Sequence, residues 1–399
     1  MSARRDFDVV IAGGGMVGAA LAALLATLPA TIRLKVALIE PHPPRAPLPN
    51  EPLDLRVSAL SHAALRILRD VGAWPRLVER QPCAYERMVV WDAAAAIDSR
   101  DTLVFDAAEL GEPDLGWIAE NRAVAAALTE RALATGVTLL RESVTGLELG
   151  AELARVALGE RHLGAGLVVA ADGGESPLRA LAGITGHATP YPQEAVIAHL
   201  RSARPHARTA RQRFLASGPL ALLPLADGCV SLVWSTSPAS AIELLAQDAT
   251  AFGHAVTVAS DGVLGELTLA SERARFPLRR YQADRYSANR FVLVGDAAHA
   301  VHPLAGQGVN QGLLDARCLV DELAGALARG EDVGDARALG RYARARRADN
   351  LIMGMALNAL WQLFSDQRTL VGRLRRTGLG LVNRASPLKQ LLTGRALGA

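Results

Sequence analysis

The sequence predicts an α/β fold in which a Rossmann-like domain is interrupted by a second, β-sheet-rich domain and followed by a helical C-terminal region. Three observations support this prediction. A glycine-rich turn follows the first apolar segment, and two later apolar segments each end in an acidic residue beside a glycine. Short apolar runs that end in such turns and lead into helices are typical of the parallel strands of α/β domains.

The first element is an apolar strand, predicted over residues 8–12, which leads through a glycine-rich turn into an alanine- and leucine-rich helix that ends near Leu28. The G-x-G-x-x-G positions of this turn are held by Gly13, Gly15 and Gly18, with Met16 and Val17 between the last two. In this pattern the first glycine permits a tight turn and the second lets the backbone approach a pyrophosphate. The third lets the helix pack on the strand.

A second strand, predicted over residues 36–39, ends in Glu40, which lies 22 positions after Gly18. A carboxylate at this position can bind ribose hydroxyls and favours an adenosine ribose without a 2′-phosphate. Strand, glycine turn, helix, second strand and terminal acid together predict a dinucleotide site. A further helix is predicted over residues 61–71.

The middle of the chain repeats part of this arrangement. A strand is predicted over residues 167–171, and Asp172 and Gly173 follow it. Ser176 is placed to begin a helix, with Arg179 one turn into it. Alone, this motif predicts only a turn between a strand and a helix. Beside the other two motifs, it predicts a further part of the same ligand site.

The third motif is an apolar strand that begins at Phe291, ends in Gly295 and Asp296, and leads through a turn rich in proline and glycine to a helix that opens at Gly308. Asp296 can accept hydrogen bonds from sugar-like hydroxyls. The amides of Gly308, Val309 and Asn310 are expected at a helix N-terminus, where anionic groups bind. The first and last motifs are therefore predicted to converge on one large ligand.

The second domain is predicted from a different pattern. A helix is expected over residues 124–134, but residues 85–92 indicate a strand, and two apolar runs flank Asp227-Gly228, a dipeptide that favours a hairpin turn. The predicted division assigns 1–75, 106–185 and 285–350 to the discontinuous first domain, 76–105 and 186–284 to the sheet-rich domain, and 351–399 to the C-terminal region. The sheet face turned toward the ligand is expected to carry Arg213, Phe214, residues 220–225, Val233 and Trp234, although plain sheet core is an equally good interpretation of each.

Composition excludes several classes of protein. The balance of 43 basic and 40 acidic residues gives a net charge of +3, so no nucleic-acid partner is predicted. The three cysteines have no metal-binding spacing and indicate buried thiols in a reducing compartment. Asp296, His299 and His302 are three positions apart, but Pro303 and nearby glycines predict a loop, which favours structural roles over a metal site. No metal is expected.

Residues 9–32 carry no charge and imitate a secretory signal. Four glycines and Pro29 interrupt the run, and Glu40 stands at the register expected of a dinucleotide fingerprint. We therefore expect neither a signal nor a transmembrane span, and a cytoplasmic location.

In this order, the three motifs resemble those of the single-component (class A) FAD monooxygenases. The resemblance implies a FAD-binding Rossmann-like domain with an inserted substrate domain. It places the fingerprint and Glu40 on the adenosine and pyrophosphate half of FAD, the Asp172 motif near the pyrophosphate and the NAD(P)H route, and Asp296 at the ribityl chain. The cofactor-binding residues that it implies are Gly13, Gly15, Met16, Val17, Gly18, Glu40, Arg56, Arg122, Asp172, Gly173, Arg179, Asp296, Pro303, Gly306, Gly308, Val309 and Asn310.

Within that class the chain is similar, almost from end to end, to the flavin-dependent hydroxylases of ubiquinone biosynthesis, which act on polyprenylated phenols. The segments that carry this similarity are 56–61, 68–74, 85–92, 116–122, 218–224 and 383–389. The similarity implies hydroxylation with O2 and NAD(P)H through a flavin hydroperoxide at carbon 4a. Only one G-x-G-x-x-G unit is present, which fits a nicotinamide donor that docks transiently. No residue is singled out as a catalytic base.

Other functions remain open at this stage: a hydroxylase of a small soluble aromatic, a flavin reductase, or a non-catalytic flavoprotein in a ubiquinone-biosynthesis complex. A halogenase is disfavoured because the sequence lacks W-x-W-x-I. Residues 351–364 are apolar at helical spacing and lie between two groups of arginines. They predict a packing helix, a homo-oligomer contact, or peripheral contact with the inner membrane.

Overall fold

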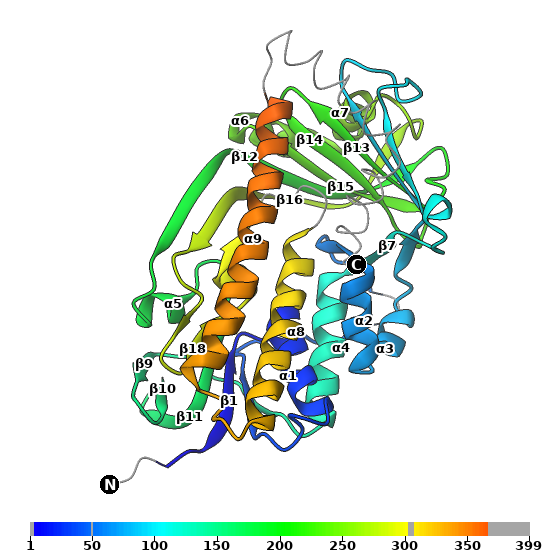
Figure 1. Ribbon diagram of the computed structural model, residues 1–399. Coiled ribbons are helices and arrows are strands. Elements are labelled where there is room, and N and C mark those ends of the chain that lie inside the picture. Colours follow the sequence, from blue (N-terminus) through cyan, green and yellow to red (C-terminus); the bar gives the residue numbers. More distant parts are fainter. Residues whose placement is uncertain (1–3, 49–50, 302–306, 366–399) are drawn as a thin grey trace.

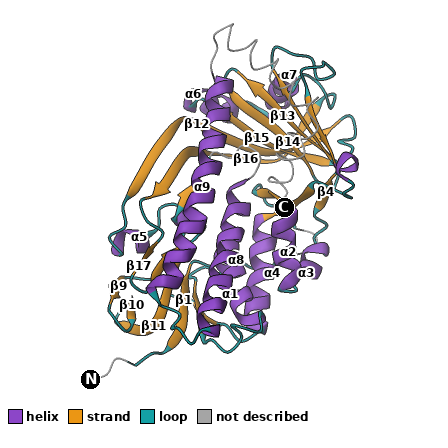
Figure 2. Ribbon diagram, in the orientation of Figure 1, coloured by secondary structure: helices purple, strands orange, loops and turns teal. Residues whose placement is uncertain are grey.

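The computed structural model describes residues 4–48, 51–301 and 307–365. Two large sheets lie toward opposite ends of this part of the chain, with a layer of helices beside the lower one (Figure 1). The long helix α9 (Ala336–Ser365) runs past both sheets, and a small three-stranded sheet lies between them. Figure 2 shows the same layers by type of secondary structure.

The first sheet is built around parallel strands, as the sequence predicts. Its order is β17-β18-β11-β1-β2-β8, and neighbours from β18 to β8 pair in parallel. The strands are β1 (Phe7–Ala12), β2 (Val36–Ile39), β8 (Thr138–Leu140), β11 (Arg161–Ala170), β17 (Ser287–Ala288) and β18 (Phe291–Leu293), with the antiparallel β9 (Gly146–Leu149) and β10 (Ala154–Leu158) beside β11. The central strands are almost continuously apolar, because a parallel sheet of this kind is buried.

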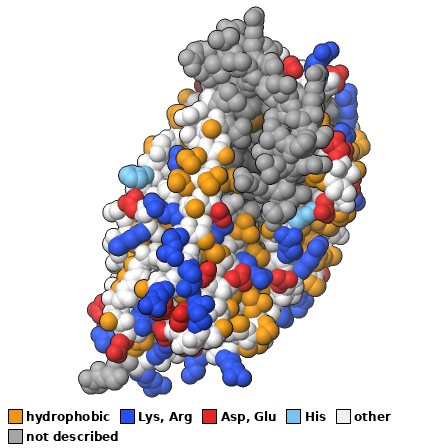
Figure 3. All heavy atoms as spheres, in the orientation of Figure 1, with side chains coloured by type: hydrophobic (Ala, Val, Ile, Leu, Met, Phe, Trp, Pro, Cys, Tyr) orange, Lys and Arg blue, Asp and Glu red, His pale blue; other side chains and the backbone are white. Residues whose placement is uncertain are grey.

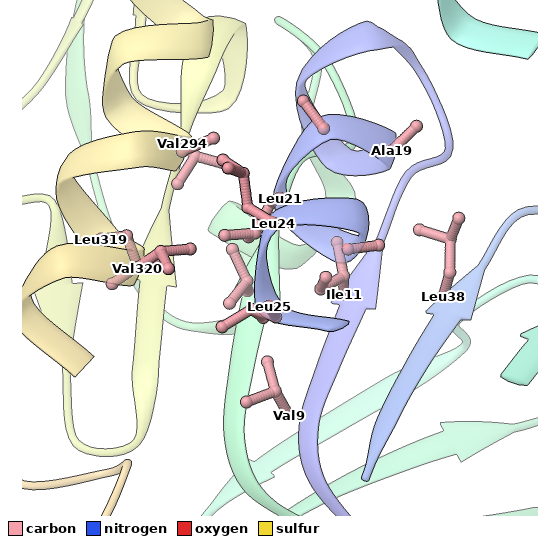
Figure 4. Close-up of a cluster of buried hydrophobic side chains, with 14 of the residues drawn as sticks. Val9, Ile11, Ala19, Leu21, Leu24, Leu25, Leu38, Val294, Leu319 and Val320 are labelled. Carbon is pink, nitrogen blue, oxygen red and sulfur yellow. The ribbon is translucent and has the colours of Figure 1, made fainter. Parts of the chain in front are cut away.

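Three helices belong to the layer beside this sheet: α1 (Met16–Thr27), α4 (Asn121–Ala134) and α8 (Gln307–Ala328). Helix α1 lies between the other two and carries no charged residue, as expected of a helix that is buried nearly all round. Figure 4 shows Leu21, Leu24 and Leu25 of α1 in one cluster with Leu319 and Val320 of α8. The N-terminal and C-terminal parts of the chain therefore share one hydrophobic core.

The second sheet is mainly antiparallel, with the order β19-β16-β12-β15-β14-β13-β5-β6. Its strands are β5 (Arg87–Asp92), β6 (Leu103–Asp106), β12 (Gly186–Ser202), β13 (Thr209–Leu215), β14 (Gly218–Pro224), β15 (Cys229–Thr236), β16 (Leu267–Ala283) and β19 (His299–Ala300). The predicted hairpin is confirmed, because β14 and β15 pair on either side of Asp227-Gly228. Gly228 has a φ of +84°, a backbone angle that favours glycine. The division into domains remains a prediction.

The two faces of the second sheet have different partners. One face packs against α6 (Pro238–Ala246) and α7 (Ala249–Ala259). Four residues that were expected on the ligand side lie instead on this helix-covered face: Arg213, Leu220, Leu222 and Trp234. Arg213 donates a hydrogen bond to the carbonyl of Ala259, at the end of α7, at 3.0 Å. For these four the prediction was wrong, because successive side chains of a strand point to opposite faces. Phe214 and Val233 belong to clusters on the other face.

The small sheet contains β3 (Val57–Leu60), β4 (Cys83–Tyr85) and β7 (Gly116–Glu120), in the order β3-β7-β4. The strand predicted over residues 85–92 is confirmed from Arg87 to Asp92 as β5, but Tyr85 ends β4, which belongs to a different sheet. The chain passes between them at Glu86, whose amide donates to the carbonyl of Arg208 at 2.8 Å and whose carbonyl accepts from Ala107 at 2.9 Å. These contacts outside both ladders divide one apolar run into two strands.

The remaining short helices are α2 (His62–Asp70), α3 (Trp74–Val78), α5 (Pro177–Leu181), and the single turns η1 (Ala107–Leu110) and η2 (Gly295–Ala297). Ser61 and Ser176 cap α2 and α5, as predicted for a side-chain oxygen at a helix start. The predicted border at residue 351 falls inside α9, which is continuous. Among the described residues, no helix combines the length and apolar character needed to cross a membrane.

Candidate FAD site

Four loops meet at one edge of the first sheet. Strands β2, β1, β11 and β18 are neighbours and run in the same direction, so their carboxyl ends lie side by side. Just beyond these ends the chain reaches Glu40, Gly13, Asp172 and Gly295. Ligands of open α/β sheets bind at this edge. The three motifs, distant in sequence, are thus brought together at the expected place.

The glycines of the first loop are needed for two different reasons, close packing of the chain and space for a ligand. A Cβ at Gly13, where φ is +104°, would lie 2.3 Å from the carbonyl oxygen of Ala171, and one at Gly18 would lie 1.9 Å from that of Gly13. Both glycines are therefore required by the packing of the chain itself. A Cβ at Gly15 would meet no atom within 4 Å. Its lack of a side chain leaves open space at the N-terminus of α1, where a phosphate group can approach.

Glu40 holds the glycine-rich loop in place. Its Oε2 accepts a hydrogen bond from the amide of Gly14 at 2.7 Å, and its Oε1 accepts one from the amide of His42 at 3.0 Å. A carboxylate oxygen has a second lone pair, so these bonds leave acceptor capacity for ribose hydroxyls. The predicted binding of ribose by Glu40 is compatible with this arrangement. The hydrogen bond between Glu40 and the Gly14 amide was not predicted from the sequence.

Val17 joins the first loop to the last. A Cβ built at Gly312 on α8 would lie 2.5 Å from Val17 Cγ2, and one at Gly295 would lie 3.2 Å from the same atom. The side chain of Val17 therefore rests against two glycines that are far away in sequence. Met16, which begins α1, is partly buried against the same core.

The Asp172 loop has an acceptor that the rest of the described chain does not satisfy. Asp172 Oδ2 accepts from the amide of Leu178 at 3.1 Å. Its Oδ1 is buried and has no hydrogen-bond partner among the described residues. Burial raises the pKa of Asp172 above its ordinary value. Gly173, with a φ of +82°, forms the turn beside it. A buried acceptor without a partner is the kind of group that a ligand donor satisfies.

Arg179 connects this loop to two other parts of the molecule. Its Nη2 donates to the carbonyl of Gly174 at 3.0 Å, and its Nη1 donates to that of Ala297 at 2.8 Å. The Cζ atom lies 4.0 Å from the ring centroid of Tyr281 on β16. Arg179 thus holds the Asp172 and Asp296 loops together against the second sheet. Contact between Arg179 and the cofactor remains a prediction.

Asp296 stands in η2 at the end of β18. Its side chain is exposed to solvent, yet the surrounding protein raises its pKa above the ordinary value, and His299 and Arg279 only partly offset this effect. Both observations fit a carboxylate that is open on one side and surrounded by protein on the others. Such a group can accept hydrogen bonds from ligand hydroxyls.

The start of α8 has an open position and a buried one. A Cβ at Gly308 would meet no atom within 4 Å, whereas Val309 is partly buried against the first core. The side chain of Asn310 donates to the carbonyl of Ala59 at 2.8 Å and accepts from the amide of Ser61 at 3.0 Å. It therefore fixes α8 to the junction of β3 and α2. The predicted contacts at Pro303 and Gly306, and His302, lie outside the described residues.

The two basic residues taken from the resemblance lie near the small sheet. The Arg56 guanidinium lies 5.7 Å from the ring centroid of Phe276 on β16. Arg122 donates to Glu51 at 2.8 Å and to Glu120 at 3.2 Å. Hydrogen bonds from Arg45, from the Leu48 amide and from Arg122 lower the pKa of Glu51 to about 2. Two carboxylates thus balance the charge of Arg122, and its contact with FAD remains a prediction.

One group of residues beneath the site was missed by sequence reasoning. His299 Nε2 and Asp315 Oδ2 are 2.5 Å apart, and both side chains are buried. His299 lies in the short strand β19 and not in a loop, contrary to the prediction. A signal for Asp315 was available, because it shares a stripe of α8 with the small or apolar residues Gly312, Ala316 and Leu319. No group of metal-ligand type was found within the described ranges.

The residues at this edge suit a dinucleotide such as FAD. Gly15 leaves room at a helix N-terminus, where the macrodipole favours phosphate groups. Glu40 and Asp296 offer acceptors at two separate positions, and Asp172 Oδ1 lacks a donor. Acceptors suit the hydroxyls of ribose and ribityl groups. The site can therefore bind an extended ligand with phosphates in the middle and hydroxyl groups on either side.

Comparison with known proteins supports this conclusion. Residues 6–350 match the family described as FAD binding domain. The chain is 35% identical to 3-demethoxyubiquinol 3-hydroxylase of Escherichia coli, with 98% of each protein covered. It is 34% identical to the ubiquinone biosynthesis monooxygenase COQ6 of Xenopus tropicalis, with 96% of this chain and 92% of that protein covered. It is 35% identical to the ubiquinone hydroxylase UbiL of Rhodospirillum rubrum, with 100% and 91% covered.

Solved structures have the same fold. p-Nitrophenol 4-monooxygenase PnpA of Pseudomonas putida superposes with a TM-score of 0.75 at 17% identity, with 98% of each chain covered. PqsL of P. aeruginosa, in complex with 2-aminobenzoylacetate, gives a TM-score of 0.74 at 23% identity, with 94% of this chain and 99% of that chain covered. The chain therefore belongs to the FAD-binding-domain family and is an FAD-dependent monooxygenase, one whose curated relatives are named as hydroxylases and monooxygenases of ubiquinone biosynthesis.

Proposed function

We propose that this chain hydroxylates the aromatic ring of a polyprenylated phenol in ubiquinone biosynthesis, with FAD bound and with NAD(P)H and O2 consumed. The observation that carries the proposal is similarity over nearly the whole chain to three curated relatives whose names refer to ubiquinone or its precursors. Identities of 34% to 35% to relatives with different names do not distinguish ring positions. The proposal therefore specifies a class of phenol and leaves the ring carbon unassigned.

The second sheet supports an apolar substrate. On the face away from α6 and α7, Phe214 belongs to a cluster with Val301, which lies five residues after Asp296. Val233 and Phe276 form another cluster on the sheet, and Phe276 contacts Arg56. This apolar face thus lies near the cofactor loops. An apolar wall suits a lipophilic phenol, because it excludes water from the reacting ring.

FAD supplies the oxygen-transfer chemistry when it is bound. The protein's own contribution is to bind and orient. Glu40 and Asp296 accept hydrogen bonds from hydroxyl groups, the open N-terminus of α1 accommodates phosphate, and the backbone at the start of α8 offers amides. Arg179 keeps the Asp172 and Asp296 loops together, so that the acceptors keep a fixed separation.

The direct test uses the purified FAD-loaded protein with a short-chain polyprenylphenol. NAD(P)H oxidation should accelerate, and mass spectrometry should detect one oxygen atom from isotopically heavy O2 in the product. A soluble aromatic acid serves as the comparison. Faster turnover with that acid would replace the proposed substrate class. NAD(P)H oxidation without an oxygenated product would indicate a reductase, and no stimulation by any phenol would indicate a non-catalytic flavoprotein.

A test in cells addresses the pathway. Cells that lack this gene should lose ubiquinone and accumulate a prenylphenol, detected by mass spectrometry of the quinone fraction. The mass of that intermediate would identify the missing hydroxylation. Unchanged ubiquinone in a strain with no second hydroxylase of this family would contradict the proposal.

We also propose peripheral membrane contact through α9. Leu351, Ile352 and Met355 are exposed, and Figure 3 shows hydrophobic side chains gathered on the upper part of that helix. The exposed Arg344 and Arg347 precede them by about one turn. Apolar groups beside basic ones bind anionic bilayers. Sedimentation with anionic vesicles should fall for Ile352→Glu, and equal sedimentation would favour contact with another protein chain or a second copy.

A further inference from the structure

A buried polar network lies directly beneath the Asp296 loop. Its centre is Asp315 of α8, whose side chain is 0% exposed. Asp315 Oδ2 accepts from the amide of Gly295 at 3.0 Å and lies 2.5 Å from His299 Nε2. Gly295 is the residue before Asp296. One carboxylate oxygen is therefore bound to both ends of the segment that carries the predicted ribityl-binding acid.

The other oxygen of Asp315 is bound to α9. Asp315 Oδ1 accepts from Arg346 Nε at 2.6 Å and from Asn350 Nδ2 at 3.1 Å. Arg346 Nη2 also donates to Gln311 Oε1 at 2.9 Å and to Asn350 Oδ1 at 3.0 Å. Gln311 lies in the first turns of α8. The planar guanidinium thus contacts α8 at two positions, which a single ammonium group cannot do in the same geometry.

We propose that Arg346 and Asn350 of α9, acting through Asp315, are positioning residues for FAD: they hold the Asp296 loop and the start of α8 in the binding arrangement. None of the three is among the residues predicted to bind the cofactor. Their effect passes through the Gly295 amide, through His299 and through Gln311. The C-terminal helix therefore takes part in building a site whose other elements come from the first sheet.

The electrostatics of Asp315 agree with this role. Burial alone raises the pKa of a carboxyl group, but His299 and Arg346, by charge and by hydrogen bonding, lower the pKa of Asp315 below its ordinary value. The carboxylate is thus held ionised in the protein interior. Removal of one partner from a buried ion network leaves the other charge uncompensated. Because the Asp296 loop is hydrogen-bonded to this carboxylate, its position should change when Arg346 or Asn350 of α9 is substituted.

The chain offers a matched control on the same helix. Tyr342, four residues before Arg346, is also fully buried and donates its hydroxyl to the carbonyl of Leu293 at 2.8 Å. That bond joins α9 to the strand β18, whereas the network joins α9 to α8 and, through Asp315, to the loop that follows β18. Tyr342→Phe therefore removes a buried contact between α9 and β18 without touching Asp315.

The experiment compares Arg346→Lys, Asn350→Ala and Tyr342→Phe. The dissociation constant of FAD is measured for each apoprotein by quenching of flavin fluorescence, and thermal unfolding of each apoprotein gives its stability. We expect Arg346→Lys to bind FAD about tenfold more weakly than Tyr342→Phe, because charge-assisted hydrogen bonds are lost. Asn350→Ala should shift the dissociation constant in the same direction by a smaller factor.

The comparison distinguishes positioning from general stability. Weaker FAD binding than in Tyr342→Phe, at equal or higher apoprotein stability, supports the proposal. FAD binding equal to that of Tyr342→Phe overturns it and leaves the network as plain core. If Arg346→Lys does not yield a folded apoprotein, Asn350→Ala decides by the same criterion. Wild-type FAD binding is the reference throughout, so the result does not depend on the substrate.

Discussion

The Gly13–Gly18 loop and the Asp296 loop lie at the same edge of the first sheet, but different interactions stabilise them. The Gly13–Gly18 loop is shaped mainly by close packing of backbone against backbone, and the carboxylate of Glu40 adds one hydrogen bond from the Gly14 amide. The Asp296 loop is held by a buried carboxylate with partners on α8 and α9. The steric contacts of the first loop include Ala171, the residue that follows the neighbouring strand β11. The second depends on helices that follow it in sequence.

This difference determines whether a substitution in each loop should reduce folding stability or FAD binding. Backbone packing cannot yield by more than a few tenths of an ångström, so an added methyl group should damage the fold itself. A hydrogen-bonded loop can shift while the core stays intact, so its variants should lose ligand before they lose structure. Changes at the two loops therefore separate folding from FAD binding.

The largest effect is expected at Gly18. In Gly18→Ala the new Cβ would lie 1.9 Å from the carbonyl oxygen of Gly13, so strand and helix must separate. We expect the free energy of unfolding to fall by about 3 kcal/mol or more, measured by urea denaturation of the apoprotein. Gly15→Ala is the control, with an expected loss of at most about 1 kcal/mol, because Gly15 is the N-cap of α1 and alanine is a poorer N-cap residue. Equal stability of the two variants would show that this loop can relax.

The next effect concerns binding at the other loop. In Asp296→Asn we expect the FAD dissociation constant to rise by roughly 10- to 100-fold, because hydrogen bonds to a charged acceptor are lost. Apoprotein stability should not fall, since the side chain is exposed. Titration of FAD fluorescence measures the constant, and Asp98→Asn, which changes an exposed acid in the segment between β5 and β6, is the control. A dissociation constant like that of the control would remove Asp296 from the site.

A smaller effect on binding is expected at Gly15. The methyl group of Gly15→Ala meets no protein atom, but it would occupy the space where a pyrophosphate approaches. FAD binding should weaken by about tenfold while apoprotein stability stays near that of wild type. Isothermal titration calorimetry with FAD checks this prediction. Unchanged affinity would mean that the phosphates pass farther from the loop than the fingerprint implies.

The smallest effect is a pH dependence. The pKa of Asp296 is raised in the folded apoprotein, so between the unfolded-state pKa near ~3.9 and the folded-state pKa the native protein binds more protons. Its contribution to stability therefore falls as pH rises through that window. The apoprotein of Asp296→Asn should melt on the order of 1 °C higher than wild type at neutral pH, with no gain below pH ~4. A gain that persisted in acid would have another origin.

Sequence reasoning succeeded where the cause is local. The helix starts at Ser61 and Ser176 and the Asp227-Gly228 hairpin depend on residues within a few positions of one another, and the glycine loop after β1 was recognised from its own short spacing. Backbone angles and short-range hydrogen bonds determine such features, whatever the rest of the chain does.

It failed where the outcome depends on a distant partner. Arg213 and Trp234 were expected toward the ligand, but α6 and α7 cover the face that they occupy. The strand predicted over residues 85–92 begins only at Arg87, because Tyr85 pairs in the small sheet. Period-2 alternation separates two faces but does not say which face meets which neighbour.

By itself, the sequence determined that this protein has a parallel sheet with a dinucleotide loop, and that acids follow three of its strands. These features arise from short spacings that stereochemistry makes specific. Only the tertiary structure decided that Asp315 supports the Asp296 loop, that Arg346 on α9 completes the network, and that Arg122 is balanced by Glu51 and Glu120. Those contacts join residues far apart in the chain, and burial gives them their strength.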